Sequence, residues 1–440
     1  MAYRIVNARI VNEGTIIEGD LVVADGRILG VNTGAPVGAV VIDAAGAYLV
    51  PGMIDDQVHF REPGFEHKAT IETESRAAVA GGITSYMEMP NTKPQTVTAE
   101  ALADKHARAA ARSMANYGFY FGATNDNLEA IKAVDQRLAC GVKVFMGSST
   151  GNMLVDDERT LEGIFAGSPL VIATHCEHTP TIIANEAAAR ARYGDDIPFS
   201  EHPRIRSEEA CYQSSSLAVE LATRHHARLH VLHITTAREL NLFHSGGLAG
   251  KRITAEACVH HLFFNDESYT TKGAAILCNP AIKSPADQQA LWAAVNDGRI
   301  DVIATDHAPH TVAEKARPYT EAPAGLPLVQ HAMASLFEHV HAGRFTVETV
   351  VEKTAHAPAR LFDIAARGFI REGYWADLAL VDPTMPTPPD PIYSKCGWSP
   401  FTGIALRSRV RMTWVNGELR YQDGGFFPGT GGCALEFARP

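Results

Sequence analysis

Five residues able to bind a metal or move a proton stand at or near the ends of short apolar runs. They are His59, Lys143, His175, His233 and Asp306. Three neutral imidazoles, a carboxylate and a lysine together suit a divalent metal such as zinc. A lysine ammonium cannot bind a cation. Burial lowers the pKa of a lysine, however, and the free amine can react with CO2 to give a carbamate, an anionic oxygen ligand.

Each of these residues has an ordinary structural explanation when it is taken alone. The chain has 19 histidines, most of which we expect at the surface or at helix ends. Lys143 alone would be a solvated lysine with its stem on apolar surface, and Asp306 could cap a helix. The coincidence of all five at comparable positions of successive apolar runs favours a shared site.

The elements that would position these residues form a repeating pattern. Amphipathic, Ala-rich helical stretches separate eight short apolar runs, which are 52–60, 82–89, 116–122, 141–146, 169–175, 228–233, 253–259 and 300–307. Eight strand–helix alternations predict a (β/α)8 barrel, which we assign to residues 52–370. The active site of such a barrel lies at the carboxyl ends of its strands, where the five residues would converge.

The two ends of the chain differ from the middle in their pattern of apolar and polar residues. Residues 1–51 alternate apolar and polar residues in short runs, with Asp25-Gly26 as a hairpin turn, and 371–440 does the same around Asn416-Gly417. We predict that both segments join in one small discontinuous β-sandwich domain.

Composition excludes several function classes. A net charge of -11 without a basic cluster argues against nucleic acid or an anionic membrane as a partner. No run of about 18 apolar residues is present, and the N-terminus does not resemble a signal peptide. The seven cysteines are scattered and form no C-x-x-C pair, which favours a reducing cytoplasm. The partner that remains is a small molecule.

Several motifs together resemble the cyclic amidohydrolases of the amidohydrolase superfamily, and within them the dihydroorotases. They are PGMIDDQVHFREPG, MPNTKP, VKVFM, ATHCE, LHITT, NPAIKS, ATDHAPH and CGWSPFTG, and they span nearly the whole chain in family order. The resemblance implies reversible hydrolysis of a cyclic amide, between (S)-dihydroorotate and N-carbamoyl-L-aspartate in pyrimidine biosynthesis. It also implies two zinc ions.

The resemblance assigns a role to each of the five residues. His59 and Asp306 would bind the more buried α metal, and His175 and His233 the β metal. Lys143, carboxylated by CO2, would bridge the two, and Asp306 would act as catalytic base and then acid. Some bacterial dihydroorotases use an aspartate bridge instead, so Asp156 and Asp157 stay open as alternatives to Lys143.

A second set of residues would bind an anionic substrate. Arg61 can hold a carboxylate with its planar fork, unless it forms a surface salt bridge with Glu62. The full predicted set is Arg61, Asn91, Asn279, His310, Gly325 and Leu326. We expect 311–324 to form a mobile lid, while 147–153 is either a loop over the site or an ordinary Gly/Ser turn.

Gln57 departs from the family pattern, which has the first histidine of a His-x-His pair there. Because Gln57 and His59 are two apart, both should face the site. An amide oxygen is a weaker zinc ligand than imidazole, so Gln57 would be a weak ligand or a hydrogen-bond partner. The α site would then hold its metal less tightly.

Two rival functions remain. The first is another cyclic amidase, a hydantoinase or allantoinase. The second is non-catalytic, because some dihydroorotase-like chains have lost metal ligands and serve as structural partners of aspartate transcarbamoylase. We expect a homodimer, and contact with aspartate transcarbamoylase is a further partner that the resemblance suggests.

Overall fold

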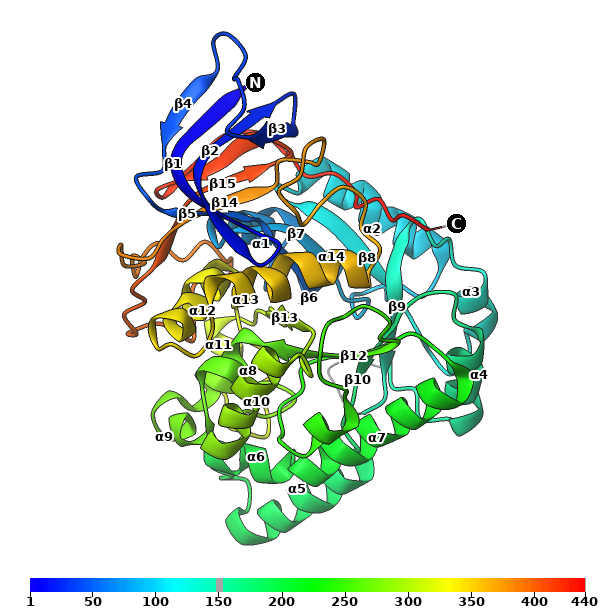
Figure 1. Ribbon diagram of the computed structural model, residues 1–440. Helices are drawn as coiled ribbons and strands as arrows, with labels where there is room; N and C mark the ends of the chain where they lie inside the picture. The colour runs from blue at the N-terminus through cyan, green and yellow to red at the C-terminus, as the bar shows by residue number, and fades with distance from the viewer. Residues whose placement is uncertain (148–152, 440) are drawn as a thin grey trace.

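The computed structural model describes residues 1–147 and 153–439, and its centre is a parallel barrel (Figure 1). Each predicted apolar run overlaps one barrel strand: β6 (Met53–Val58), β7 (Ile83–Glu88), β8 (Asn116–Gly122), β9 (Ala139–Phe145), β10 (Ile172–His175), β11 (Leu229–Val231), β12 (Ile253–Cys258) and β13 (Val302–Ala304). Neighbours in sequence are neighbours in the sheet. The ends meet where the His59 N–H donates to the His307 carbonyl at 2.7 Å. The predicted barrel is confirmed.

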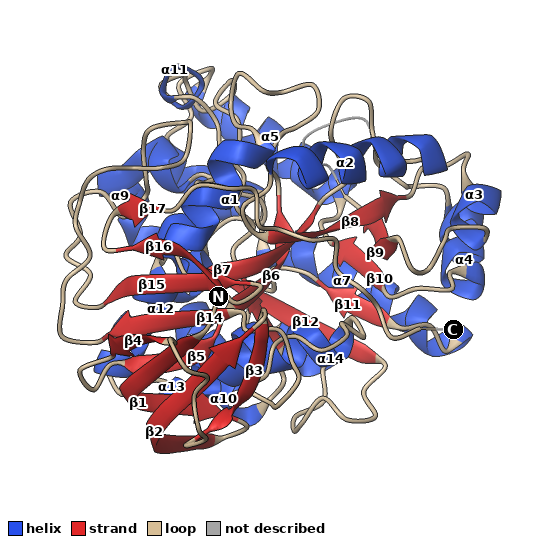
Figure 2. Cartoon of the chain, turned by 90° about the horizontal axis from the view of Figure 1, so that it is seen from above, coloured by secondary structure: helices blue, strands red, loops and turns tan. Residues whose placement is uncertain are grey.

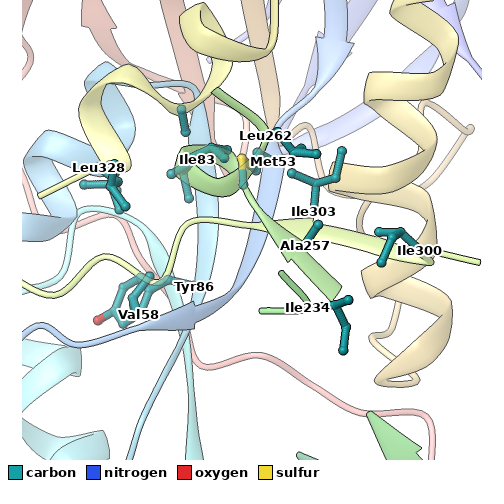
Figure 3. Packing of buried hydrophobic residues seen from close by; sticks show 14 of the residues in the cluster. Met53, Val58, Ile83, Tyr86, Ile234, Ala257, Leu262, Ile300, Ile303 and Leu328 are labelled. Atoms are coloured by element: carbon teal, nitrogen blue, oxygen red, sulfur yellow. The ribbon is translucent and has the colours of Figure 1, made fainter. Parts of the chain in front are cut away.

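Alternation along the strands divides their side chains between two layers. Met53 and Ile303 belong to the core between the strands and the surrounding helices, whereas Ile54 and Val302 belong to the core inside the barrel. Figure 3 shows the outer layer, in which Met53 and Ile83 lie close to Ile303 and Leu262. This alternation leaves inward-facing positions near the carboxyl ends of the strands for polar side chains.

Helices cover the barrel and begin at recognisable signals. Thr70 and Ser284 form capping boxes at α1 and α10, and Gly298 ends α10 at a φ of 81°. The helices are α1 (Ile71–Ala80), α2 (Ala99–Arg112), α3 (Leu128–Lys132), α4 (Glu158–Gly167), α5 (Thr179–Tyr193), α6 (His202–Ile205), α7 (Glu208–His225), α8 (Val259–Phe263), α9 (Tyr269–Lys272), α10 (Pro285–Asp297), α11 (Val312–Lys315), α12 (Ala332–His341), α13 (Val347–Val351) and α14 (Ala357–Leu361). Residues 148–152 of the predicted loop 147–153 lie outside the described chain.

The second sheet is mostly antiparallel and combines both ends of the chain (Figure 2). Its strands are β1 (Tyr3–Asn12), β2 (Thr15–Ala24), β3 (Arg27–Val31), β4 (Val40–Asp43), β5 (Tyr48–Pro51), β14 (Leu378–Asp382), β15 (Arg409–Val415), β16 (Glu418–Gln422) and β17 (Gly425–Phe426). The N- and C-terminal parts meet where β5 pairs with β14. Leu378 and Leu380 face a core within this sheet, whereas Ala379 and Val381 pack toward the barrel helices.

The C-terminal tail does more than complete this sheet. The Leu435 N–H donates to the Tyr117 carbonyl in β8 at 2.8 Å, and Arg439 donates to the carbonyls of Ala139 and Cys140 in β9. The side chains of Leu435 and Phe437 join the core inside the barrel. The tail therefore packs against the amino-terminal ends of barrel strands, a contact that the sequence pattern did not predict. No helix in the described chain is long and apolar enough to cross a membrane.

Candidate metal-dependent active site

A small pocket lies at the carboxyl ends of the barrel strands and gathers most of the predicted site residues. Its lining consists of Gln57, His59, Arg61, Lys143, Phe145, His175, His233, Asn279, Asp306, Ala308, Ala324 and Gly325. Residues more than 240 positions apart in the chain thus share one cavity. Of the predicted set, Asn91, His310 and Leu326 do not line it.

One half of the pocket is built around the Asp306 carboxylate. Its Oδ1 is 3.1 Å from Nε2 of Gln57 and 3.2 Å from Nε2 of His59. Gln57 and His59 therefore face the same group, as their spacing predicts. Nδ1 of His59 lies 2.8 Å from Oδ1 of Asn91 and must donate to it, because an amide oxygen only accepts. Asn91, predicted as a substrate contact, thus orients His59 and leaves its Nε2 directed at Asp306.

The other half of the pocket holds a facing pair of imidazoles. Nδ1 of His175 lies 3.0 Å from Nε2 of His233. On its far side, Nε2 of His175 is 3.1 Å from Glu177. Burial opposes ionisation of Glu177, but Arg206 and His175 outweigh it and lower the pKa of this carboxyl to about 2. The negative charge of Glu177 at this distance favours the tautomer of His175 with its proton on Nε2, and the Nδ1 lone pair of His175 then points to His233.

Lys143 lies between the two halves in a largely apolar setting. Its side chain is 1% exposed, and Nζ is 4.7 Å from the centre of the Phe145 ring. In the described chain no carboxylate comes within 4 Å of this nitrogen. Burial lowers the pKa of Lys143 to about 8, although Asp306 and Glu256 partly oppose the shift. Roughly a tenth of the amine is therefore unprotonated at pH 7, far more than for an ordinary lysine.

Three pocket residues have backbone conformations that L-residues rarely adopt. The φ angles are 70° at Arg61, 41° at His233 and 51° at Asp306. Each follows a strand end by two or three residues, at the point where the chain leaves the barrel. Such conformations cost about 1–3 kcal/mol each and persist where the surroundings impose them. At these three positions they accompany the turn of the chain that places the side chains in the pocket.

Arg61 is buried, with its guanidinium directed into the pocket. The alternative of a surface pair with Glu62 is excluded, because Glu62 forms its ion pairs with Arg112 and Arg108. Arg61 Nε donates to the Pro309 carbonyl at 3.1 Å, and within the described chain no carboxylate lies within 4 Å of the guanidinium. Burial lowers the pKa of Arg61 to about 10, so it remains cationic at neutral pH. A buried cation without an anionic partner is ready to bind an anion.

His310 lies behind Arg61. Lys68 Nζ, which can only donate when charged, is 3.0 Å from Nδ1 of His310, so Nδ1 accepts. Nε2 then carries the proton and donates to the Ala324 carbonyl at 3.0 Å. The Nη2 of Arg61, also 3.0 Å from this Nε2, is a close contact between two donors. In this tautomer His310 therefore packs against Arg61 without a hydrogen bond between them.

The three other predicted substrate contacts differ in what they offer. Asn279 has a buried side-chain Oδ1 without a hydrogen-bond partner in the described chain. Gly325 lines the pocket, but its N–H donates to Leu277 and its carbonyl accepts from Lys315. A Cβ there would lie 2.4 Å from the Ala308 carbonyl oxygen, so the glycine permits close packing. The Leu326 carbonyl accepts from Ala308, and its side chain belongs to the outer core.

Two further expectations concern neighbouring segments. Asp157 caps α4, Asp156 contacts Asn125, and neither lines the pocket, which leaves Lys143 as the residue placed between the two halves.

The segment 311–324 contains α11, and Lys315 holds it by donating to the carbonyls of Leu277, Pro323 and Gly325. Its predicted role as a lid stays a prediction.

Glu177 was not identified as a site residue from the sequence. It stands two positions after His175 in the motif ATHCE, and a carboxylate so close to a ligand candidate is a usable signal.

The donor set fits a divalent metal. Burial lowers the pKa values of His59, His175 and His233, so all three rings are neutral at pH 7 and have lone pairs to offer. Nδ1 of His175 and Nε2 of His233 lie 3.0 Å apart, and either one bound cation or one shared proton would satisfy both nitrogens. Neutral imidazoles with a carboxylate are ligands that zinc prefers.

Comparisons with known proteins agree with this geometry. A dihydroorotase of Halobacterium salinarum is 37% identical over 398 residues, covering 87% of this chain and 91% of the relative. An allantoinase of Bacillus velezensis is 33% identical over 435 residues, covering 97% and 95%. The solved structure of an L-hydantoinase (dihydropyrimidinase) from Arthrobacter aurescens has a TM-score of 0.92 at 26% identity and covers 99% of both chains. The model of the amidohydrolase family matches residues 48–420, and the chain belongs to that family.

Proposed function

We propose that this amidohydrolase is a dihydroorotase, which interconverts (S)-dihydroorotate and N-carbamoyl-L-aspartate in pyrimidine synthesis. One observation carries the proposal: the buried guanidinium of Arg61 lines the pocket without a carboxylate partner in the described chain. Dihydroorotate has a ring carboxylate that would supply the missing anion. Charged, bidentate hydrogen bonds of this kind are stronger than neutral ones and fix the orientation of the ring.

The residues that would hold the metals follow from the two halves of the pocket. His59 and Asp306, with Gln57 beside them, would hold the α metal, and His175 and His233 the β metal. Zinc, when bound, supplies Lewis-acid activation of water and of the amide carbonyl.

The carbamate of Lys143 would complete the site. The unprotonated amine attacks CO2, one N–C bond forms, and one proton leaves the nitrogen. The product is an anion, and it removes the buried positive charge that an ammonium would place beside the metals. A pKa of about 8 for Lys143 makes the amine available near neutral pH.

Asp306 would move the proton in the reaction. The Oδ1 atom is held by Gln57 and lies 3.2 Å from His59, which fixes the carboxylate in the pocket. In hydrolysis the carboxylate takes a proton from the attacking water and delivers it to the leaving ring nitrogen, as general base and then acid. In ring closure the same groups act in reverse order.

A second candidate is a hydantoinase or allantoinase, favoured by the similarity to the Bacillus velezensis allantoinase and the Arthrobacter aurescens L-hydantoinase. Hydantoin and allantoin carry no ring carboxylate, so Arg61 would have no partner in either complex. A third candidate is the non-catalytic partner of aspartate transcarbamoylase.

Steady-state kinetics on four substrates separates these functions. We expect kcat/KM for dihydroorotate to exceed that for dihydrouracil, which lacks only the carboxylate, by at least about 100-fold. Greater activity on hydantoin or allantoin would favour the second candidate. An enzyme loaded with zinc that turns over none of the four would favour the third. The predicted homodimer, and any complex with aspartate transcarbamoylase, can be tested by native mass spectrometry of the same sample.

A further inference from the structure

A second polar cluster lies inside the barrel, next to the pocket but not part of it. It consists of Asp56 in β6, His230 in β11 and Glu256 in β12, and each is 0% exposed. His230 Nε2 is 3.2 Å from Oδ2 of Asp56 and 3.7 Å from Oε2 of Glu256. The three candidate ligand atoms lie within 4.8 Å of one another. None of the three side chains lines the pocket.

The hydrogen bonds of Thr254 determine which nitrogen of His230 faces the carboxylates. The Thr254 hydroxyl donates to the Leu229 carbonyl at 3.1 Å, so its oxygen must accept from Nδ1 of His230 at 2.8 Å. Nδ1 therefore carries a proton. Nε2 faces the carboxylates of Asp56 and Glu256, and it carries either a lone pair or a second proton. A lone pair there requires a cation between the three groups.

The carboxylates of this cluster lack the set of donors that another buried carboxylate, Glu74, has. Glu74, also 0% exposed, accepts from His307, Ser394, Thr73 and the Lys395 N–H. By contrast, neither oxygen of Asp56 nor Oε2 of Glu256 has a hydrogen-bond partner among the described residues. Unpaired buried carboxylate oxygens are costly, so these atoms indicate a ligand.

A divalent ion would neutralise the cluster without protonating any of its members. With both carboxylates ionised, an imidazolium would leave a net charge of -1 in the barrel interior, whereas a divalent cation with a neutral imidazole gives zero. Burial disfavours an imidazolium, although Asp56 and Glu256 attract positive charge strongly enough to raise the pKa of His230 to about 9. Burial and the charge of Asp56 also raise the pKa of Glu256 to about 7, so protons on His230 and Glu256 are the competing occupants, and a metal count distinguishes them from a cation.

We propose that Asp56, His230 and Glu256 bind a structural divalent cation, with zinc or manganese as the ions that one imidazole and two carboxylates suit. This site is separate from the metals of the pocket and would tie β6, β11 and β12 together inside the barrel. Glu256 links the two, because its Oε1 accepts from the backbone N–H of His233 at 3.0 Å. The cation would thus also support the position of a pocket residue.

The test counts metal ions in the whole protein, expressed and purified with zinc. Native mass spectrometry should find one zinc ion fewer per chain in Asp56→Asn and in His230→Gln than in the wild type. Glu74→Gln is the matched control, since it alters a buried carboxylate–histidine pair whose oxygens are already satisfied, and it should keep the full count. His175→Ala should lose pocket metal while it keeps the ion of the cluster.

Anomalous diffraction from wild-type crystals at the zinc edge locates each ion without relying on any variant. A peak between Asp56, His230 and Glu256 would support the site even if the variants do not fold. No peak there, with an equal zinc count in wild type and Asp56→Asn, would overturn the proposal and leave a buried imidazolium pair. Neither readout depends on turnover, so the result is independent of the proposed dihydroorotase activity.

Discussion

The side-chain amide of Gln57 donates a 3.1 Å hydrogen bond to Oδ1 of Asp306, the proposed catalytic base. The amide oxygen of Gln57 is thereby turned toward the thiol of Cys258, at 3.7 Å. The family pattern has a histidine at this position. Here a neutral amide restrains the carboxylate of Asp306, and the nitrogen that faces the site has no lone pair for a metal.

We expect the two pocket metals to differ in affinity because of this substitution. Gln57→His supplies an imidazole nitrogen in place of the amide, so it should make the α metal harder to remove. Titration with a chelator, followed by metal analysis, measures this directly. Two equally tight sites in the wild type, unchanged in Gln57→His, would show that Gln57 does not weaken the α site.

Arg61→Lys should impair binding of the substrate carboxylate while it keeps the positive charge. A lysine cannot reproduce the planar fork, and the loss of paired charged hydrogen bonds costs about 2–4 kcal/mol, or roughly 30- to 1,000-fold in kcat/KM for dihydroorotate. Residual activity on neutral dihydrouracil is the control and should change little. An effect below about threefold on dihydroorotate would contradict the role of Arg61.

Carboxylation of Lys143 should depend on pH in one direction. Only the free amine reacts with CO2, and the pKa of Lys143 is about 8, so the amine is mostly protonated below pH 8 and mostly free above it. Reactivation of chelator-treated enzyme by labelled bicarbonate and zinc should therefore speed up as pH rises through about 8. Carbon-13 NMR of the reactivated enzyme should show the carbamate.

Lys105 is the internal control for this modification. It is also 1% exposed, but its ion pair with Glu88 at 2.8 Å opposes the lowering of its pKa by burial and occupies the amine, so we expect it to take up no label. Lys143→Ala should lose activity and metal, with partial recovery of both when a short-chain carboxylic acid is added. An unmodified Lys143 in zinc-loaded crystals would defeat the idea.

Glu177→Gln should weaken the β metal without removing any of its ligands. The neutral amide places no negative charge beside Nε2 of His175. Loss of such a partner typically lowers metal affinity by about 10- to 100-fold. Competition with a chromophoric chelator gives the affinity. An unchanged affinity in Glu177→Gln would mean that other contacts orient His175 without it.

Glu177 should also contribute to the pH dependence of stability. Its pKa in the folded protein is about 2, against an ordinary value of 4.5. For a carboxyl with a lowered pKa, the stabilisation is present above the ordinary value and is lost as pH falls toward the folded value. Metal-free wild type should therefore lose stability between pH 4.5 and 2 more steeply than metal-free Glu177→Gln, as measured by urea unfolding.

Lys315→Met should loosen the segment 311–324. The substitution removes three hydrogen bonds to backbone carbonyls, two of which belong to Pro323 and Gly325 at the end of the segment. Chymotrypsin should then cut faster after Tyr319 than in wild type, and N-carbamoyl-L-aspartate should slow the cut in both proteins. Arg317→Met on the same segment is the control. Equal cleavage in all three, without any effect of the ligand, would count against a lid.

Local patterns in the sequence determined the barrel and most of the pocket. Apolar runs with a period of two define strands, and residues at the carboxyl ends of parallel strands must meet at one rim. That geometric rule by itself predicts that His59, Lys143, His175, His233 and Asp306 lie together. Turn residues such as Asp25-Gly26 and Asn416-Gly417 likewise determined both hairpins.

Tertiary structure decided the partner of each polar group, because hydrogen bonds between distant segments leave no periodic signal. Oδ1 of Asn91 accepts from His59, and the backbone groups of Gly325 are already paired. The unpaired carboxylates of Asp56 and Glu256 become visible only when β6 and β12 face each other inside the barrel. Strand alternation can predict that a side chain points inward, but which donors meet it there depends on packing across the whole barrel.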